Sequence, residues 1–456
     1  MPQDTSGPHS GDDRDLLAEL IAATKARGAD AADAVLVRST SLSHSLRLGE
    51  IEKLEREESQ DLGLRAIIGK KQAIVSSTDL GRTALDELSE RAVAMARAVP
   101  DDPWCGLADP DQIGSTAPEL DMVDANEPSG EALIAQARTC EEAALAVAGI
   151  TNSEGASAGY SLTRVALAAS NGFAGAYGRS DHGIGVSVIA GEGVGMEGDY
   201  DYSSTVHAED LEDPATIGRR AGERAIARLG ARKMPTSQVP VVYDPRVANG
   251  LLRHLVGAIN GPSIARGTSF LKDSLNTKIF ADGIVVVDDP HRRRGLRSKP
   301  FDGEGIANRR MNLIEDGVLT TWLLDLASAR QLVLETTGHA SRGTSGPPSP
   351  APTNLWLEPG TPSPEELIAD IGSGFYVTSM MGMGVSGVTG DYSRGASGFW
   401  IENGKISFPV SEMTVAGNLK SMFLAMVPAN DLEFRYGTDS PTVRIDGMTV
   451  AGGGEG

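Results

Sequence analysis

The side chains of this chain that could bind a metal ion in a short motif are seven histidines and two cysteines. Hydrolysis at a zinc ion needs closely spaced ligands beside a carboxylate that activates the metal-bound water. No two histidines stand within one or two helical turns, and the cysteines are too far apart for a Cys-x-x-Cys pair. The sequence therefore contains no short-spaced zinc motif, while a site assembled from distant residues stays open. The residues are His9, His44, His182, His207, His254, His291, His339, Cys105 and Cys140.

Three other patterns look like catalytic or phosphate-binding motifs but do not support that chemistry. Asp181 and His182 are adjacent, and adjacent side chains on a strand point to opposite faces, so structural roles are predicted for both. The glycine-rich run 191–198 has acidic residues where a phosphate would sit and lacks Gly-Lys-Ser/Thr, so a turn is predicted there. Ser386 does not stand in the Gly-x-Ser-x-Gly pattern of a nucleophile elbow. The chain therefore shows no sequence evidence for a serine hydrolase.

Residues 373–420 carry the most informative signature, including Met380-Met-Gly-Met-Gly-Val-Ser-Gly387 and Gly398-Phe-Trp-Ile-Glu-Asn-Gly404. Together with Asp302-Gly-Glu-Gly305 and Asn312-Leu-Ile-Glu-Asp-Gly317, these runs resemble the C-terminal half of the TldD/PmbA family. Members of that family are two-subunit metallopeptidases that were once described as modulators of DNA gyrase. The resemblance covers nearly the whole chain from about residue 13, strongly after residue 245 and only in outline before it.

The resemblance also implies which subunit of the family this chain is. The family's peptidase subunit carries His-Glu-x-x-x-His on a helix, and here the matching helix has Arg253 at the first histidine, His254 at the glutamate and Ala258 at the second histidine. The family takes a third zinc ligand from a C-terminal cysteine, but no cysteine follows Cys140. The guanidinium of Arg253 stays protonated and would repel a cation. The chain thus resembles the PmbA-type (TldE-type) subunit, with no metal-binding and no catalytic residue expected in it.

The activity implied by the resemblance is hydrolysis of unfolded or flexible peptides in a closed cavity formed with a zinc-bearing TldD-type partner. This chain would complete the cavity, hold the extended peptide, have no cofactor of its own and be inactive alone. Two other function classes stay open, namely a homodimeric peptide-binding protein without peptidase activity and a regulator of DNA gyrase. The residues expected to contact the peptide or the other subunit are Arg253, His254, Met380, Asp391 and Arg394.

Composition narrows the partners and the location of this protein. Its 456 residues are enough for two or three domains with a buried core, and its formal net charge of −21 argues against a nucleic-acid partner. The one basic cluster, 291–299, follows acidic residues and is interpreted as a solvated loop rather than a binding patch. The sequence shows neither a signal-peptide pattern nor an apolar run of about eighteen residues, so no membrane partner is expected. Two isolated cysteines fit a reducing compartment, and a cytoplasmic protein is expected.

The hydrophobic pattern of the whole chain predicts an α+β fold that begins with a mixed helix and sheet domain over residues 13–232. This domain is expected to follow a disordered leader at 1–12 and to contain two subdomains, at about 13–100 and 129–232. Short β-rich runs predict a meander between residues 33 and 76, and Asn171-Gly172 predicts a hairpin turn. Helices are predicted from about residue 16 to Gly28 and at about 83–98, 129–148 and 214–230.

A β-rich, barrel-like C-terminal domain is predicted for residues 238–450, followed by a flexible tail at 451–456. Asp244-Pro245, an N-cap followed by a proline, predicts the start of the helix that carries Arg253 and His254. A further helix is predicted at about 364–373. The segment 382–398 is rich in glycine beside several methionines, which is compatible with a flexible loop lining a cleft or with a tight barrel corner.

Overall fold

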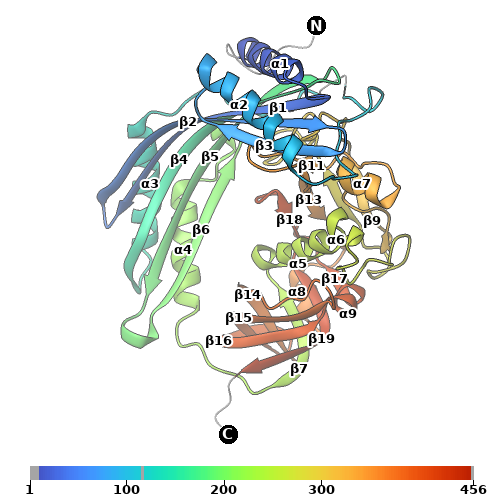
Figure 1. Ribbon diagram of the computed structural model, residues 1–456. Helices are drawn as coiled ribbons and strands as arrows, with labels where there is room; N and C mark the ends of the chain where they lie inside the picture. Colours follow the sequence, from blue (N-terminus) through green and yellow to red (C-terminus); the bar gives the residue numbers. More distant parts are fainter. Residues whose placement is uncertain (1–9, 115–117, 453–456) are drawn as a thin grey trace.

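The computed structural model describes residues 10–114 and 118–452 of the chain. An N-terminal six-stranded sheet with helices faces a C-terminal region built around a β-barrel (Figure 1). The predicted α+β class and the barrel-like C-terminal domain are therefore confirmed. Among the described residues, no helix is both long and apolar enough to cross a membrane.

The N-terminal sheet is antiparallel throughout and has the strand order β3-β2-β1-β4-β5-β6. Asn171-Gly172 forms the turn between β4 and β5, as predicted, and Gly172 takes a positive φ of 101° that suits glycine. The sheet therefore consists of long hairpins whose side chains alternate between two faces. Its strands are β1 Ala31–Arg47, β2 Glu50–Ile68, β3 Lys71–Ser77, β4 Ile150–Ala169, β5 Ala174–Ala190 and β6 Glu197–Thr205.

The outer face of this sheet is covered by four helices, α1 Ser10–Ala26, α2 Arg82–Ala98, α3 Gly130–Leu145 and α4 Pro214–Ala227 (Figure 1). Leu36 and Leu64 share a buried cluster with α1 and α2, whereas Ile184 and Val186 share another with α3 and α4. Because α1 begins at Ser10, the last residues of the predicted leader are helical, and residues 1–9 lie outside the described part of the chain. Two short 3-10 turns, η1 Gly193–Gly195 and η2 Ala208–Asp210, flank β6.

The inner face of the sheet, formed by the odd-numbered residues of β1, faces the C-terminal region. At one end, which we call the covered half, Val35 and Leu167 pack against Phe301 in a buried cluster. Asp33 accepts a hydrogen bond from Arg65 Nε at 2.9 Å and forms an ion pair with Arg342 at 2.6 Å. Burial alone would raise the pKa of Asp33, but the two guanidinium groups outweigh it and lower that pKa. These contacts fix the sheet to the C-terminal region.

The C-terminal barrel closes because β16 pairs with both β15 and β19, which gives the ring β16-β15-β14-β7-β19. Phe375, Val241 and Met413 lie in its buried core. Strand β19 reaches Gly452, so residues 451–452 of the predicted tail belong to the barrel, and residues 453–456 lie outside the described part. The ring strands are β7 Ser237–Tyr243, β14 Ser373–Met381, β15 Asp391–Glu402, β16 Lys405–Asn418 and β19 Val443–Gly452, with β17 Met426–Pro428 at the edge.

A smaller sheet and several short helices complete the C-terminal region. The sheet has the order β10-β9-β8-β13-β18, and a two-stranded ladder joins β11 to β12. The predicted helix at 364–373 ends early, at Ile368, because Ile368 and Ile371 turn under Val242 and the chain then enters β14. The elements are β8 Val286–Asp289, β9 Met311–Glu315, β10 Val318–Leu319, β11 Ala340–Ser341, β12 Ser349–Pro350, β13 Asn354–Leu357, β18 Thr438–Asp439, α5 Pro245–Ala258, α6 Gly261–Ala265, α7 Leu326–Leu332, α8 Pro364–Ile368 and α9 Leu419–Leu424.

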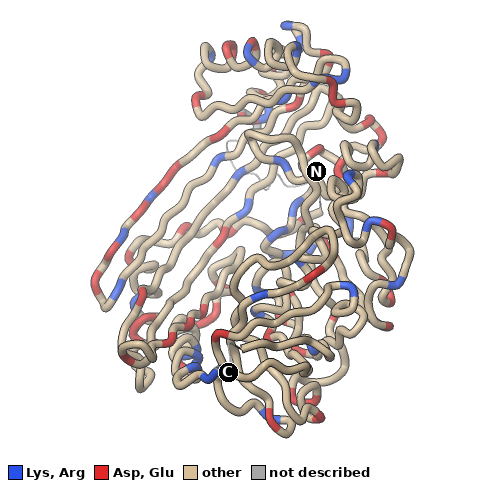
Figure 2. Tube along the Cα trace, turned by 60° about the horizontal axis from the view of Figure 1, so that its bottom comes forward, with Lys and Arg blue, Asp and Glu red and all other residues tan. Residues whose placement is uncertain are grey.

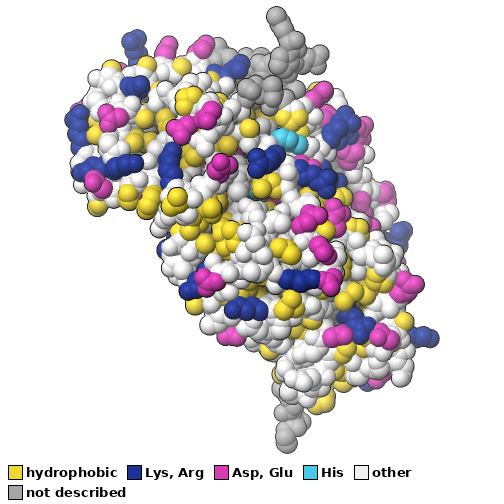
Figure 3. Space-filling model, turned by 90° about the vertical axis from the view of Figure 1, so that its right-hand side faces the viewer, with side chains coloured by type: hydrophobic (Ala, Val, Ile, Leu, Met, Phe, Trp, Pro, Cys, Tyr) yellow, Lys and Arg dark blue, Asp and Glu magenta, His cyan; other side chains and the backbone are white. Residues whose placement is uncertain are grey.

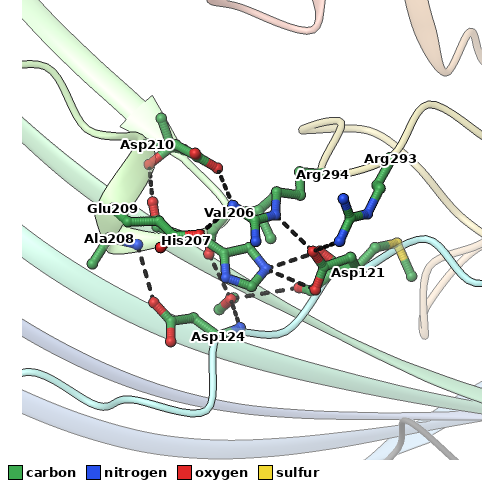
Figure 4. Close-up of polar contacts among 12 residues, drawn as sticks. Asp121, Asp124, Val206, His207, Ala208, Glu209, Asp210, Arg293 and Arg294 are labelled. Atoms are coloured by element: carbon green, nitrogen blue, oxygen red, sulfur yellow. Dashed lines mark hydrogen bonds and ion pairs between the residues drawn. The ribbon is translucent and has the colours of Figure 1, made fainter.

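A polar junction joins the two regions at a second place. Asp121, between α2 and α3, accepts hydrogen bonds from Arg293 and Arg294 at 2.8 and 2.6 Å, and it contacts His207 at 3.2 Å (Figure 4). Arg294 also reaches Glu209 at 2.6 Å. The interpretation of this basic cluster as a solvated loop is therefore wrong for Arg294, because acidic residues distant in sequence surround its guanidinium.

The side of the molecule that lies to the right in Figure 1 carries charges of both signs (Figure 3). Acidic and basic side chains are interspersed with scattered hydrophobic ones on the face shown in Figure 3. The net charge of −21 is therefore not gathered into a single patch on that face.

Candidate functional site

A cavity of about 890 Å³ lies between the lower end of the N-terminal sheet and the barrel. One wall comes from the sheet and includes Ser187 of β5 and Tyr200 of β6. The other wall comes from α5, from the end of β14 and from the loop that joins β14 to β15. Large cavities between two parts of a protein are the usual place for ligand binding, so this cavity is the candidate site.

Helix α5 forms the central part of the wall because its sequence gives it a clear start and two distinct faces. Asp244 accepts a hydrogen bond from Arg246 N at 3.0 Å, and Pro245 occupies the first helical turn, as predicted. Leu251 and Leu255 are buried in the barrel core. Arg253 and His254, which the sequence predicts to contact a peptide or a second subunit, lie on the same helix and line the cavity.

His254 lies beside the cavity and has a lowered pKa. Burial is the larger cause of the lowered pKa, and the nearby guanidinium of Arg394 lowers it further. Its ring lies edge-on to Tyr392, with 5.8 Å between the ring centroids, and its Nε2 is buried without a hydrogen-bond partner in the described residues. Arg253, by contrast, is exposed toward the cavity, and within the described residues it forms no ion pair. The wall therefore offers an unused ring nitrogen and an unpaired cation.

The loop at residues 382–390 joins β14 to β15 and is held by backbone hydrogen bonds against β15 and against the segment that follows α6. Ser393 N donates to Gly384 O at 2.7 Å, and Phe270 N donates to Gly387 O at 2.9 Å. A Cβ at Gly384 would lie 2.1 Å from Ser393 O, so the close approach requires glycine there. Both interpretations of this segment thus hold in part, because the loop is a corner of the barrel and also lines the cavity.

The structure brings together four of the five residues predicted to contact a peptide or a second subunit. Arg253, His254, Met380 and Arg394 all line the cavity, while contact with a ligand stays a prediction. Arg394 Nε also donates to Gly382 O at 3.0 Å and so supports the loop.

Asp391 is not part of the cavity wall. Its carboxylate accepts hydrogen bonds from Thr389 Oγ1 at 2.6 Å and from Asn418 Nδ2 at 3.0 Å, and these bonds lower its pKa. A negative carboxylate that is held in this way fixes the end of the loop. Asp391 therefore has a structural role where β15 begins.

Several cavity residues were missed by the sequence reasoning. Asp199 is buried and forms ion pairs with Arg246 at 2.9 Å and with Arg228 at 3.4 Å. Burial alone would lower the pKa of Arg246, but Asp199 and Asp244 outweigh it and raise that pKa. These partners lie far apart in sequence, so spacing gave no signal for the network. The alternation Asp199-Tyr-Asp-Tyr202 is a local signal for the cavity wall, because residues two apart on a strand share a face and the two tyrosines therefore lie together on the inner face of β6.

The place at which the resemblance expects zinc does not suit that ion. His254 supplies one donor, Arg253 is a permanent cation and the side chain of Ala258 has no donor atom. In residues 10–114 and 118–452, no three histidine, cysteine, aspartate or glutamate side chains lie close enough to hold a metal ion together. The residues at this place therefore do not fit a zinc ion.

Comparison with known proteins agrees with the signature in the sequence. Three family models match the chain in order: PmbA/TldA metallopeptidase domain 1 at residues 32–96, the central domain at 124–229 and the C-terminal domain at 236–452. The metalloprotease PmbA of Escherichia coli O157:H7 is 39% identical, over 93% of this chain and 92% of its own length. A PmbA homologue of Haemophilus influenzae is 36% identical, over 94% of each chain.

Solved structures share the same architecture. A protein of Bacteroides thetaiotaomicron, described as a candidate modulator of DNA gyrase, matches with a TM-score of 0.90 and 28% identity, over 98% of this chain and 100% of that chain. TldE of Thermococcus kodakarensis has the same fold, with a TM-score of 0.86 and 21% identity over 96% of this chain and 100% of that chain. From the matched domains and the relatives that align along nearly their whole length, this chain belongs to the PmbA/TldD metallopeptidase family.

Proposed function

We propose that this chain is the zinc-free subunit of a two-component peptidase, in which a TldD-type partner carries the zinc ion and cleaves unfolded peptides. The observation that carries the proposal is the wall formed by α5. At the place of a zinc motif it presents Arg253, His254 and Ala258 to a cavity of about 890 Å³. This chain would complete the cavity and hold the peptide while the partner hydrolyses it.

The lining of the cavity suits an extended peptide of varied sequence. Met380 and Met383 are flexible apolar side chains that adapt to different partners, and Met383 is 93% exposed at the mouth. Arg253 and His254 add polar groups that can bind carbonyl oxygens or charged side chains. Apolar contact with a few polar anchors is the usual composition of a ligand site.

The names of the relatives support the peptidase part of the proposal. The Escherichia coli and Haemophilus influenzae proteins are named metalloprotease PmbA and its homologue, and the Thermococcus protein is named TldE. A cytoplasmic location is part of the same proposal. It is supported by Cys105 and Cys140, which are both buried and not joined in a disulfide.

The test is a reconstitution of this chain with a TldD-type subunit. We expect cleavage of a fluorogenic unfolded peptide to be much faster with both subunits than with either alone, and we expect this chain to hold no zinc after dialysis. Met383→Ser should lower the rate of the pair, because it removes an apolar contact at the mouth. Met95→Ser, on α2 and outside the cavity, is the matched control.

Two results would overturn the proposal. One is a zinc-to-protein ratio near one in this chain alone. The other is a mixture that cleaves no faster than the partner alone. Peptide binding by a homodimer that recruits no second subunit would favour the stand-alone binding protein instead.

A further inference from the structure

A second, smaller pocket of about 190 Å³ lies between the sheet and the loop that follows β8. Three of its lining residues are cations: Arg179 on β5, and Arg297 and Lys299 on the loop. The hydroxyl-bearing residues Thr163 and Ser341 also line it. We call this feature the cationic pocket. Its composition is unusual for a chain with a net charge of −21.

The cations of the cationic pocket are held in place without carboxylate partners. Arg179 donates to Leu296 O at 2.6 Å, and Lys299 Nζ donates to Ala340 O at 3.0 Å. Within the described residues none of the three forms an ion pair, and the guanidinium of Arg297 makes no hydrogen bond. Each side-chain bond that does form is to a neutral carbonyl group, so no carboxylate pairs directly with these positive charges.

The two carboxylates that act on the charge of Lys299 are already engaged by other contacts. Asp302 accepts hydrogen bonds from the backbone N–H groups of Glu304 and Ile306, at 2.8 and 2.9 Å. Asp288 accepts a hydrogen bond from Thr353 N at 2.7 Å. These groups are anchored by other contacts, so they do not move in to pair with Lys299.

The electrostatics of the pocket favour an incoming anion. Burial lowers the pKa of Arg297 most, and the guanidinium groups of Arg253 and Arg179 lower it further, while the carboxylates of Asp439 and Asp288 offset these effects only in part. Burial also lowers the pKa of Lys299. Bringing like charges together and removing them from water is unfavourable, and a bound anion relieves both effects.

The cationic pocket adjoins the candidate site. On the inner face of the sheet, the pair Thr163 and Arg179 is followed by the pair Ser161 and Asp181, which lines an open hollow of about 390 Å³. Arg253, on the wall of the large cavity, acts on the pKa of Arg297. Figure 2 shows lysine and arginine in the middle of the molecule, where the strands approach the C-terminal region. The three hollows therefore follow one another along β5, at Arg179, at Asp181 to Gly185 and at Ser187, and we call this row of hollows the groove.

We propose that Arg179, Arg297 and Lys299 form a subsite that binds a carboxylate group of the peptide, either an acidic side chain or the C-terminus. This inference rests on the proposed function, since it assumes that the groove takes peptides. A guanidinium binds a carboxylate through two parallel hydrogen bonds, and an ammonium adds a point charge. A volume of about 190 Å³ accommodates such a group together with a short side chain. The subsite would set a preference for acidic or C-terminal segments.

The first experiment compares matched labelled peptides with this chain by fluorescence anisotropy. One unfolded peptide contains acidic residues and a free C-terminus, and its partner carries Asn and Gln in their place and a C-terminal amide. We expect the acidic peptide to bind about tenfold more tightly, as charge-assisted hydrogen bonds give. Inorganic phosphate should compete with the acidic peptide and leave the neutral one bound.

The second experiment changes the pocket itself. Arg297→Gln should reduce the tenfold preference to less than about threefold without weakening the neutral peptide, and Arg297→Lys should restore part of it. The exposed Arg82→Gln on α2 removes the same charge outside the pocket and should leave the preference unchanged. Because the guanidinium of Arg297 makes no hydrogen bond in the described residues, and only the backbone N donates, to Asn354 Oδ1 at 2.9 Å, the variant is expected to fold normally.

The outcomes separate this inference from the proposed function. Equal affinity for the two peptides overturns the carboxylate subsite but leaves peptide binding intact. Binding of phosphate without any preference between the peptides also overturns it, because the pocket would then serve a free anion. Binding of neither peptide, alone or with the TldD-type subunit, removes the proposed function and the subsite together.

Discussion

The two halves of the inner face of the N-terminal sheet use the same strands but differ in composition. In the covered half, the side chains are apolar or belong to a buried ion cluster, with Val35 at 2% exposure and Leu167 at 4%. In the other half, which we call the open half, β1 and β4 present Ser41, Ser43 and Ser157 to an open hollow. The outer face shows no such change, because helices cover it along both halves.

This difference shows how one sheet serves both as a scaffold and as a wall of the groove. Where the C-terminal region packs against the strands, burial of apolar area stabilises the contact. Where it does not, small hydroxyl-bearing residues tolerate water and leave space for a ligand. Leu46, on the outer face of β1 in the open half, is buried against α3, so the change in composition is confined to the inner face. Substitutions in the two halves should therefore have unequal effects.

The largest effect is expected for Asp33→Ala in the covered half. The change leaves Arg65 and Arg342 buried without their counter-ion, which should lower the free energy of unfolding by about 3–5 kcal/mol. Asp181→Ala in the open half removes one hydrogen bond, from Ser204, and should lower it by about 1 kcal/mol. Chemical denaturation of both variants measures the difference, and equal losses would contradict the comparison.

The aromatic contact of the covered half should be nearly as sensitive. Phe301 lies 4.9 Å from Phe173 and 5.5 Å from Tyr177 between ring centroids, and Phe301→Ala would leave a cavity among them. We expect a loss of about 3 kcal/mol in thermal or chemical unfolding. Tyr202→Ala in the open half, where the residue is 37% exposed, should lose about 1 kcal/mol or less. A larger loss for Tyr202→Ala would mean that the open half is covered in solution.

A pH-dependent effect is expected from Glu304, which lies beside the buried ion cluster. Burial, and then the charge of Asp302, raises its pKa from 4.5 to about 8. Between those values the folded chain binds a proton that the unfolded chain has lost, so this contribution to stability is complete below pH 4.5 and declines as the pH rises toward 8. Glu304→Gln should flatten that decline in Tm, whereas Glu335→Gln on an exposed turn should not. An equal decline of Tm with pH in the wild type and in Glu304→Gln would refute the raised pKa of Glu304.

The smallest effects are expected from a matched pair of glycines. A Cβ at Gly63 in the covered half would lie 2.3 Å from Thr344 O, so Gly63→Ala should force the backbones apart and lose about 1–3 kcal/mol. A Cβ at Gly183 in the open half would meet its nearest atom at 4.0 Å, so Gly183→Ala should change stability by about 0.5 kcal/mol or less. Circular dichroism melts of both variants provide the measurement. Reversed sensitivities would show that the open half is the tighter contact.

Parts of the fold and site were predictable because their signals are local. Asp244-Pro245 marked the start of α5, Asn171-Gly172 marked a hairpin, and the signature around Gly398 became the barrel strands. The predicted helix at 364–373 ran too long because packing of Ile371 under Val242 ends it. The place of Asp391 outside the cavity wall was not predictable, because spacing alone does not show that Thr389 and Asn418 already hold its carboxylate.

The sequence by itself determined the α+β class, the membership of the family and the replacement of a zinc motif by Arg253, His254 and Ala258. These features depend on residue types and on spacing within one segment. Only the tertiary structure decided which half of the sheet is covered, where Asp199 meets Arg246, and that Arg179, Arg297 and Lys299 share a pocket. Such contacts join residues that are distant in sequence, because they form when the barrel packs against one end of the sheet and leaves the other end open.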